Sequence, residues 1–63
     1  MTKREIKRTA QRLAELELII QHSDDPNARR AAQEETMDIC NRYSDLADME
    51  KIDAEVLKIL NQS

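Results

Sequence analysis

Apolar side chains recur at steps of three and four residues over the first third of the chain. The series is Ile6, Ala10, Leu13, Leu16 and Ile20. This spacing puts one side chain per turn on a single face of an α-helix. Thr2 and Glu5 stand at the spacing of a capping box, and Met1 and Ile6 occupy the positions of a hydrophobic staple around it. The pattern predicts a helix over about residues 3–22.

A polar segment with the only proline interrupts this pattern at residues 23–27. Asp25 is a good helix cap, and Pro26 is favoured at the first helical position. The following series of small and apolar positions keeps helical spacing: Ala28, Ala32, Thr36, Ile39, Tyr43 and Leu46. We therefore expect a turn over 23–25 and a second helix over about 26–44.

A turn this short makes the two helices an antiparallel hairpin. Residue numbers that face each other should then sum to about 48. The register pairs Ile6 with Tyr43, Ala10 with Ile39, Leu13 with Thr36 and Leu16 with Ala32. It also brings Lys3 opposite Asp45, so unlike charges would meet at the open end of the hairpin.

A third apolar stripe follows, made of Met49, Ile52, Val56, Ile59 and Leu60. Ser44, Asp48 and Asp53 are each plausible caps for it. Two arrangements fit: a third helix folds back after a break near residues 44–48, or one long helix runs on and its end pairs with another subunit. We favour the break, with a helix over about 48–61. The expected fold is all-α, a helical hairpin plus a third short helix, resembling a three-helix bundle.

Composition supports helices and limits the core. The 63 residues include no Gly, one Pro and one aromatic residue, and 37% are charged, which is typical of helical bundles. One domain of this size is at the edge of what a single core can stabilise. Surplus apolar side chains therefore suggest self-association, as a homodimer or larger homo-oligomer, or a protein partner. The candidate interaction surface comprises Leu18, Ile19, Met37, Met49, Leu57 and Leu60.

Charge is segregated along the chain. The candidate basic face consists of Lys3, Arg4, Lys7, Arg8 and Arg12, and the candidate acidic face of Asp45, Asp48, Glu50, Asp53 and Glu55. Attraction between the two ends would fix the direction of the hairpin, and we favour this structural interpretation. The functional alternatives are nucleic-acid binding by the basic face and imitation of a phosphate backbone by the acidic one, which would inhibit a nucleic-acid enzyme such as a defence nuclease. The net charge of −3 and the lack of aromatic residues near the basic face disfavour nucleic-acid binding.

Chemistry-bearing motifs are sparse. The sequence has no glycine-rich phosphate loop and no nucleophile beside a recognisable base, so we expect no enzyme activity and no cofactor. One His and one Cys cannot close a zinc site, and we expect Cys40 to be a small buried hydrophobe. Neither a secretory signal nor an apolar run of about 20 residues is present. These features favour a cytoplasmic protein without a membrane partner.

Three stretches resemble a known group of proteins: residues 1–7 (MTKREIK), residues 13–20 (LAELELII), and Asp48-Met49 with Ile52-Asp53 before the terminal apolar repeat. Together they resemble the small uncharacterised helical proteins of about sixty residues encoded in phages and prophages of Gram-positive bacteria. The resemblance implies an accessory protein in the host cytoplasm that binds and alters a host or phage protein. It implies no particular functional residues.

Overall fold

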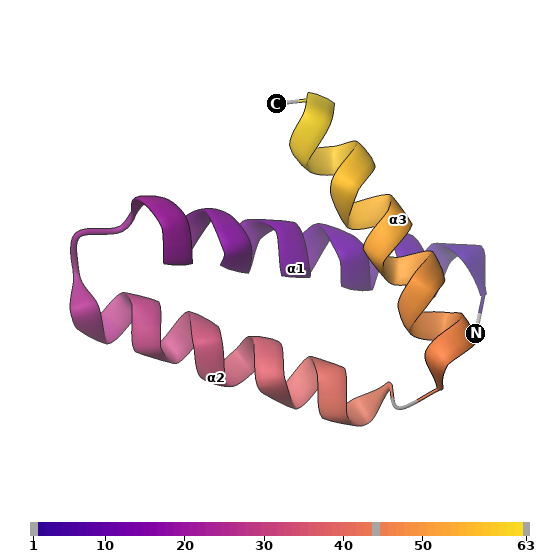
Figure 1. The fold of residues 1–63 in the computed structure, drawn as a ribbon, viewed down its shortest axis with the longest axis horizontal. Helices are drawn as coiled ribbons and strands as arrows, with labels where there is room; N and C mark the ends of the chain where they lie inside the picture. The colour runs from indigo at the N-terminus through magenta and orange to yellow at the C-terminus, as the bar shows by residue number, and fades with distance from the viewer. Residues whose placement is uncertain (1, 44, 63) are drawn as a thin grey trace.

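The computed structural model describes residues 2–43 and 45–62, which form three helices and no strand (Figure 1). Helix α1 spans Lys3–His22, α2 spans Pro26–Arg42 and α3 spans Leu46–Gln62. The all-α prediction, the turn at 23–25 and the break between the second and third helices are thus confirmed. The third helix is not short, however, because it has 17 residues, as many as α2.

Side-chain caps explain where the first two helices begin. The Thr2 hydroxyl accepts a hydrogen bond of 3.2 Å from the backbone N–H of Glu5, as the capping-box spacing predicts. At α2, Asp25 Oδ1 accepts from the backbone N–H of Asn27 at 3.0 Å, and Pro26 takes the first helical position. Both caps satisfy N–H groups that have no partner inside the helix.

The boundary between α2 and α3 differs from the prediction. Helix α2 ends at Arg42 rather than near residue 44, and α3 begins at Leu46 rather than near residue 48. The cap is Asp45, whose Oδ1 accepts from the backbone N–H of Ala47 at 2.9 Å, and not Asp48 or Asp53, which lie inside α3. Two further predictions, a cap at Ser44 and a staple with Met1, lie outside the described residues.

Helix α1 is the centre of the fold. Helix α2 runs antiparallel to it, and α3 crosses it obliquely near its N-terminal end (Figure 1). Helices α2 and α3 contact each other only weakly. Ala14 and Leu16 are both buried although they lie about 160° apart around α1. No single neighbouring helix can cover both side chains, so α1 is buried from two directions.

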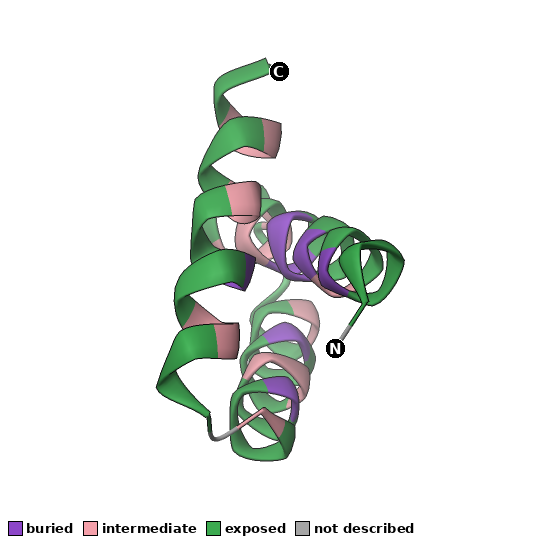
Figure 2. Cartoon of the chain, turned by 90° about the vertical axis from the view of Figure 1, so that its right-hand side faces the viewer, coloured by how far each residue is buried: buried purple, intermediate pink, exposed green. Residues whose placement is uncertain are grey.

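The core contains more of α1 than of the other helices (Figure 2). Its buried residues are Ile6, Ala10, Leu13, Leu16, Ala32, Ile39 and Ile52. The pairs Ala10–Ile39 and Leu16–Ala32 of the predicted register are thus both in the core. Tyr43 packs against its edge, half-buried. Thr36, expected opposite Leu13, is half-buried and donates its hydroxyl to the carbonyl oxygen of Ala32 at 2.8 Å.

The chain is more open than a compact domain of its size. Its Cα radius of gyration is 11.8 Å, whereas the usual scaling gives roughly 10.6 Å for 63 residues. Its accessible surface is 4950 Å² at 7.3 kDa, whereas folded monomers of that mass expose roughly 4200 Å². Both differences have the sign expected when α3 crosses α1 instead of lying along the hairpin, since a crossed helix covers less of its neighbours.

Candidate protein-interaction surfaces

The structure divides the six residues of the predicted interaction surface. Ile19 and Met49 pack against the core and are half-buried, and Leu60 is also half-buried. Leu18, Met37 and Leu57 are exposed. Met37 lies about 160° around α2 from the buried Ile39, so it points away from α1. The six residues therefore do not form one continuous patch.

A different apolar surface lies along one side of α3, which we call the α3 edge. It comprises Leu46, Met49, Val56, Leu57 and Leu60, which fall within about 100° around the helix axis and so share one side of the helix. Leu46 is 80% exposed and Leu57 is 61% exposed. Asp53 falls in the middle of this edge and is exposed, and Glu50 flanks it.

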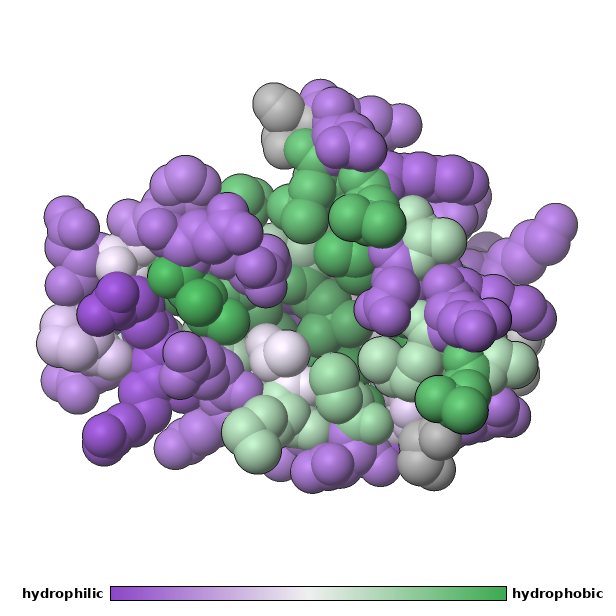
Figure 3. Space-filling model, viewed as in Figure 1, coloured by the Kyte–Doolittle hydropathy of each residue, from purple (hydrophilic) through white to green (hydrophobic). Residues whose placement is uncertain are grey.

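The α3 edge adjoins apolar surface of the other helices. Figure 3 shows apolar side chains gathered along the C-terminal half of α3, in the angle between α3 and α1, and over the seam between α1 and α2. The turn half of the hairpin is not covered by α3 (Figure 1). This open region is where further apolar contacts could be made.

Sequence reasoning placed Leu46 on the inner stripe of the second helix, and this was wrong. Its spacing from Ile39 and Tyr43 fits that stripe, but α2 ends three residues after Ile39. Leu46 then opens α3 and is almost fully exposed. The signal that could have placed Leu46 correctly is the cap residue Asp45 directly before it. With Asp45 as the cap, Leu46 becomes the first residue of α3, and Leu46, Asp53 and Leu60 follow one another at steps of seven residues on one side of that helix.

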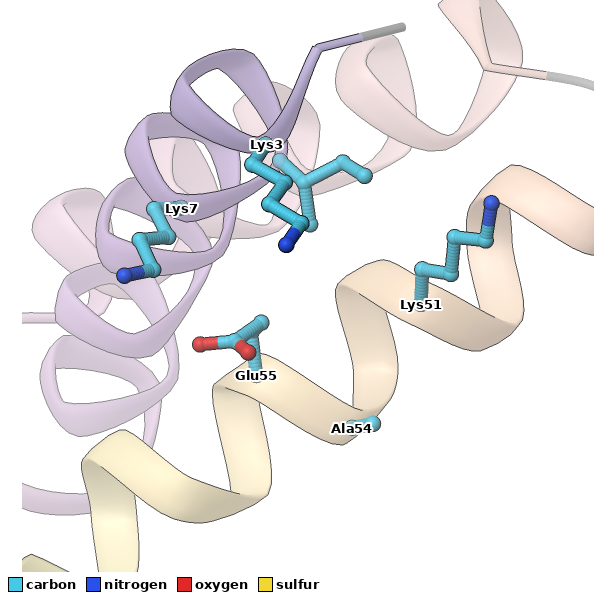
Figure 4. Close-up of a pocket in the computed structure, with 6 residues that line it drawn as sticks. Lys3, Lys7, Lys51, Ala54 and Glu55 are labelled. Atoms are coloured by element: carbon cyan, nitrogen blue, oxygen red, sulfur yellow. The ribbon is translucent and has the colours of Figure 1, made fainter.

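Most of the predicted basic face is on one surface of α1. Lys3, Arg4, Lys7 and Arg8 line a shallow cleft together with Gln11. A second cleft of about 370 Å³ lies where α3 crosses α1, lined by Lys3, Ile6, Lys7, Lys51, Ala54 and Glu55. In Figure 4, Lys3 and Lys7 come from α1, and Lys51 and Glu55 come from α3. The sequence pattern did not include Lys51, because only the helix crossing brings it close.

The fifth basic residue, Arg12, is not part of this surface because it is paired across the hairpin. Its Nη2 donates to Glu35 Oε1 at 2.9 Å, its Nε donates to Glu35 Oε2, and its Nη1 donates to Glu15 Oε2 at 3.2 Å. The hydrogen bonds from Arg12 lower the pKa of Glu35. This contact lies within one residue of the predicted hairpin register and links α1 to α2.

The five residues of the predicted acidic face have separate surroundings. Asp45 caps α3. Glu55 lines the cleft where α3 crosses α1, and its carboxylate pairs with Lys58 at 3.5 Å. Asp48 is half-buried, whereas Glu50 and Asp53 are exposed. Because Glu50 and Glu55 lie about 140° apart around α3, these carboxylates do not make one continuous surface. The expected approach of Lys3 to Asp45 is not among the ion pairs of the described residues.

The remaining candidate groups offer little chemistry. Cys40 is exposed on α2, so the expectation that it is buried was wrong. It lies about 100° around the helix from the buried Ile39, at the next position. Within residues 2–43 and 45–62, no group of three or more His, Cys, Asp or Glu side chains is arranged to hold a metal ion. None of the three helices as described combines the length and apolar character needed to cross a membrane.

Comparison of the chain with protein-family models, curated proteins and solved structures found no match.

Proposed function

We propose that this protein is a non-enzymatic protein-binding module that uses the α3 edge and the open region beside it. One observation carries the proposal: Leu46 and Leu57 are both more than 60% exposed on the same side of one helix. Exposed apolar side chains gathered on one side of a helix are typical of sites where another protein binds. An accessory protein that binds a host or phage protein would fit this role.

The open shape of the chain supports the same proposal. Val56, Ile59 and Met49 pack against the core but are only half-buried. A partner placed against α3 would remove their remaining apolar surface from water, which favours association at roughly 25 cal/mol per Å² before the costs of binding are subtracted. Contacts within the chain leave this part of the apolar surface exposed to water, so its burial is available to stabilise a complex.

A capture experiment with two matched variants tests the proposal. Leu57→Asp puts a charge on the α3 edge, and Met37→Asp puts the same charge on the outer side of α2. Their parent side chains are similarly exposed, at 61% and 65%, so both variants should fold equally well. We expect proteins from a bacterial lysate that bind immobilised wild type to be retained by Met37→Asp and lost by Leu57→Asp. Equal retention by both variants would refute the proposal.

The basic surface of α1 supports a second candidate, the binding of nucleic acid. Lys3, Arg4, Lys7 and Arg8 take part in none of the ion pairs of the described residues, and α3 adds Lys51 beside them. Contacts with phosphates would give an affinity that falls steeply as salt rises. A gel-shift series at increasing salt, with wild type and Arg4→Glu/Arg8→Glu, tests this candidate. No shift at low salt would eliminate it.

A further inference from the structure

We infer that the occupant of the α3 edge is a second copy of this chain, in a two-fold dimer where each α3 edge packs on the partner's hairpin near its turn. The inference rests on the proposed function, because it names the partner of the same surface. Three features of the chain lead to it: its surface area, the charges beside the two surfaces, and the position of Asp53.

The surface area matches what a stable dimer buries. The chain exposes 4950 Å², about 750 Å² more than folded monomers of its mass. A standard protein–protein interface buries about 800 Å² on each partner. If a second copy covers an area of this size over the α3 edge and the uncovered half of the hairpin, each chain returns to about the exposure of a compact monomer.

The charges beside the two surfaces are opposite. A hollow of about 340 Å³ lies beside the hairpin turn, lined by Ile20, Pro26, Arg29, Arg30 and Gln33. We call it the hairpin hollow. Arg29 and Arg30 make its rim positive, whereas Glu50 and Asp53 make the α3 edge negative. None of these four residues belongs to an ion pair within the described chain. Docking of the edge at the hollow brings unlike charges together in both halves of a two-fold dimer.

Asp53 argues against the simplest alternative, in which two α3 edges pack against each other. An antiparallel pairing centred on the edge would place Asp53 opposite its own copy, with Leu46 opposite Leu60. Two like charges would then meet in an apolar contact, which is unfavourable. In the edge-to-hollow arrangement, Asp53 faces Arg29 and Arg30 instead. A second copy thus satisfies the charge in the middle of the α3 edge.

Sedimentation of the full chain over a range of concentrations tests the inference. We expect wild type to change from monomer to dimer as concentration rises through the micromolar range. Leu57→Asp should raise the dissociation constant at least about tenfold, since each dimer contains the site twice. Met37→Asp, its matched control, should leave the dissociation constant within about twofold. Circular dichroism checks that both variants retain the helical content of wild type.

Charge reversal tests the arrangement within the dimer. Arg29→Glu/Arg30→Glu should weaken association, as should Glu50→Lys/Asp53→Lys, and a chain carrying all four changes should regain the wild-type constant because the opposite signs are restored. Failure of the fourfold variant to recover would refute edge-to-hollow docking. A weakening by Met37→Asp equal to that by Leu57→Asp would refute the α3 edge as the interface.

The two proposals can fail separately. A wild-type chain that stays monomeric throughout the concentration series refutes the second copy as occupant. The protein-binding proposal would still stand if lysate proteins are captured through Leu57. The converse result is that the charge-reversal variants behave as expected for the dimer while the wild-type chain captures no other protein. That result would limit the α3 edge to self-association and refute the proposed binding of a host or phage protein.

Discussion

Replacement of Ile52 by alanine is the most direct test of how α3 is held. Ile52 is 0% exposed, and it is the one residue of α3 that belongs fully to the core. Ile→Ala removes three carbon atoms, worth about 0.8 kcal/mol each in lost burial, or about 2.4 kcal/mol. A cavity adds to this loss where the surroundings cannot relax. Because α3 rests mainly on α1 and only weakly on α2, it can shift inward. We therefore expect a total cost of about 3 kcal/mol, in the lower half of the usual range.

Such a loss would be large for this chain. Domains of about 60 residues have free energies of unfolding of roughly 3–9 kcal/mol. The assay is urea unfolding followed by circular dichroism at one fixed protein concentration, because dimerisation makes the midpoint depend on concentration. Met37→Ala, 65% exposed on the outer side of α2 and outside the proposed interface, is the control and should change the free energy by less than about 0.5 kcal/mol. A cost below about 1 kcal/mol for Ile52→Ala would refute the packing of α3 described above.

Three further predictions follow from the caps, the close packing and the ion pair. Asp45→Ala should lower the free energy of unfolding by about 1 kcal/mol in the same assay, because the N–H of Ala47 loses its acceptor. Ala10→Leu should cost about 1–3 kcal/mol, since Ala10 is 0% exposed in the core and a larger side chain must push helices apart. The hydrogen bonds from Arg12 lower the pKa of Glu35 in the folded chain below its ordinary value of 4.5. The pair should therefore stabilise the fold fully at pH values above 4.5, and this stabilisation should be lost as the pH falls through the lower pKa of the folded chain. Thermal unfolding of wild type and Glu35→Gln from pH 7 to pH 2 measures that difference, which should disappear in acid.

Each of these predictions has a matched control. Asp38→Ala removes an exposed carboxylate inside α2 that caps no helix and lies outside the proposed interface, so it should be nearly neutral, and equal costs at the two positions would contradict the assignment of Asp45 as the cap. Ala47→Leu enlarges an exposed position and should be tolerated, unlike Ala10→Leu. For the ion pair, a difference between wild type and Glu35→Gln that persists at pH 2 would show that the pKa shift is not its origin.

The candidate surfaces were only partly predictable from the sequence. Periodicity identified surplus apolar residues, but it could not separate Met49, which packs on the core, from Leu57, which stays exposed. Met49 lies about 60° around α3 from the buried Ile52, whereas Leu57 lies about 140° from it, so their burial depends on the side from which α1 meets α3. Lys51 joined the basic surface for the same reason, since it lies far from Lys3 and Lys7 in sequence.

The sequence by itself determined the helices and the hairpin. Local rules sufficed, because a cap such as Thr2 or Asp25 and an apolar side chain at each turn act within a few residues. Only the tertiary structure decided that α3 crosses α1, so that Ala14 and Leu16 are buried by different neighbours and Leu46 and Leu57 remain exposed. The crossing depends on how side chains of distant segments interlock, and helical periodicity fixes the apolar side of each helix but not the direction from which another helix approaches it.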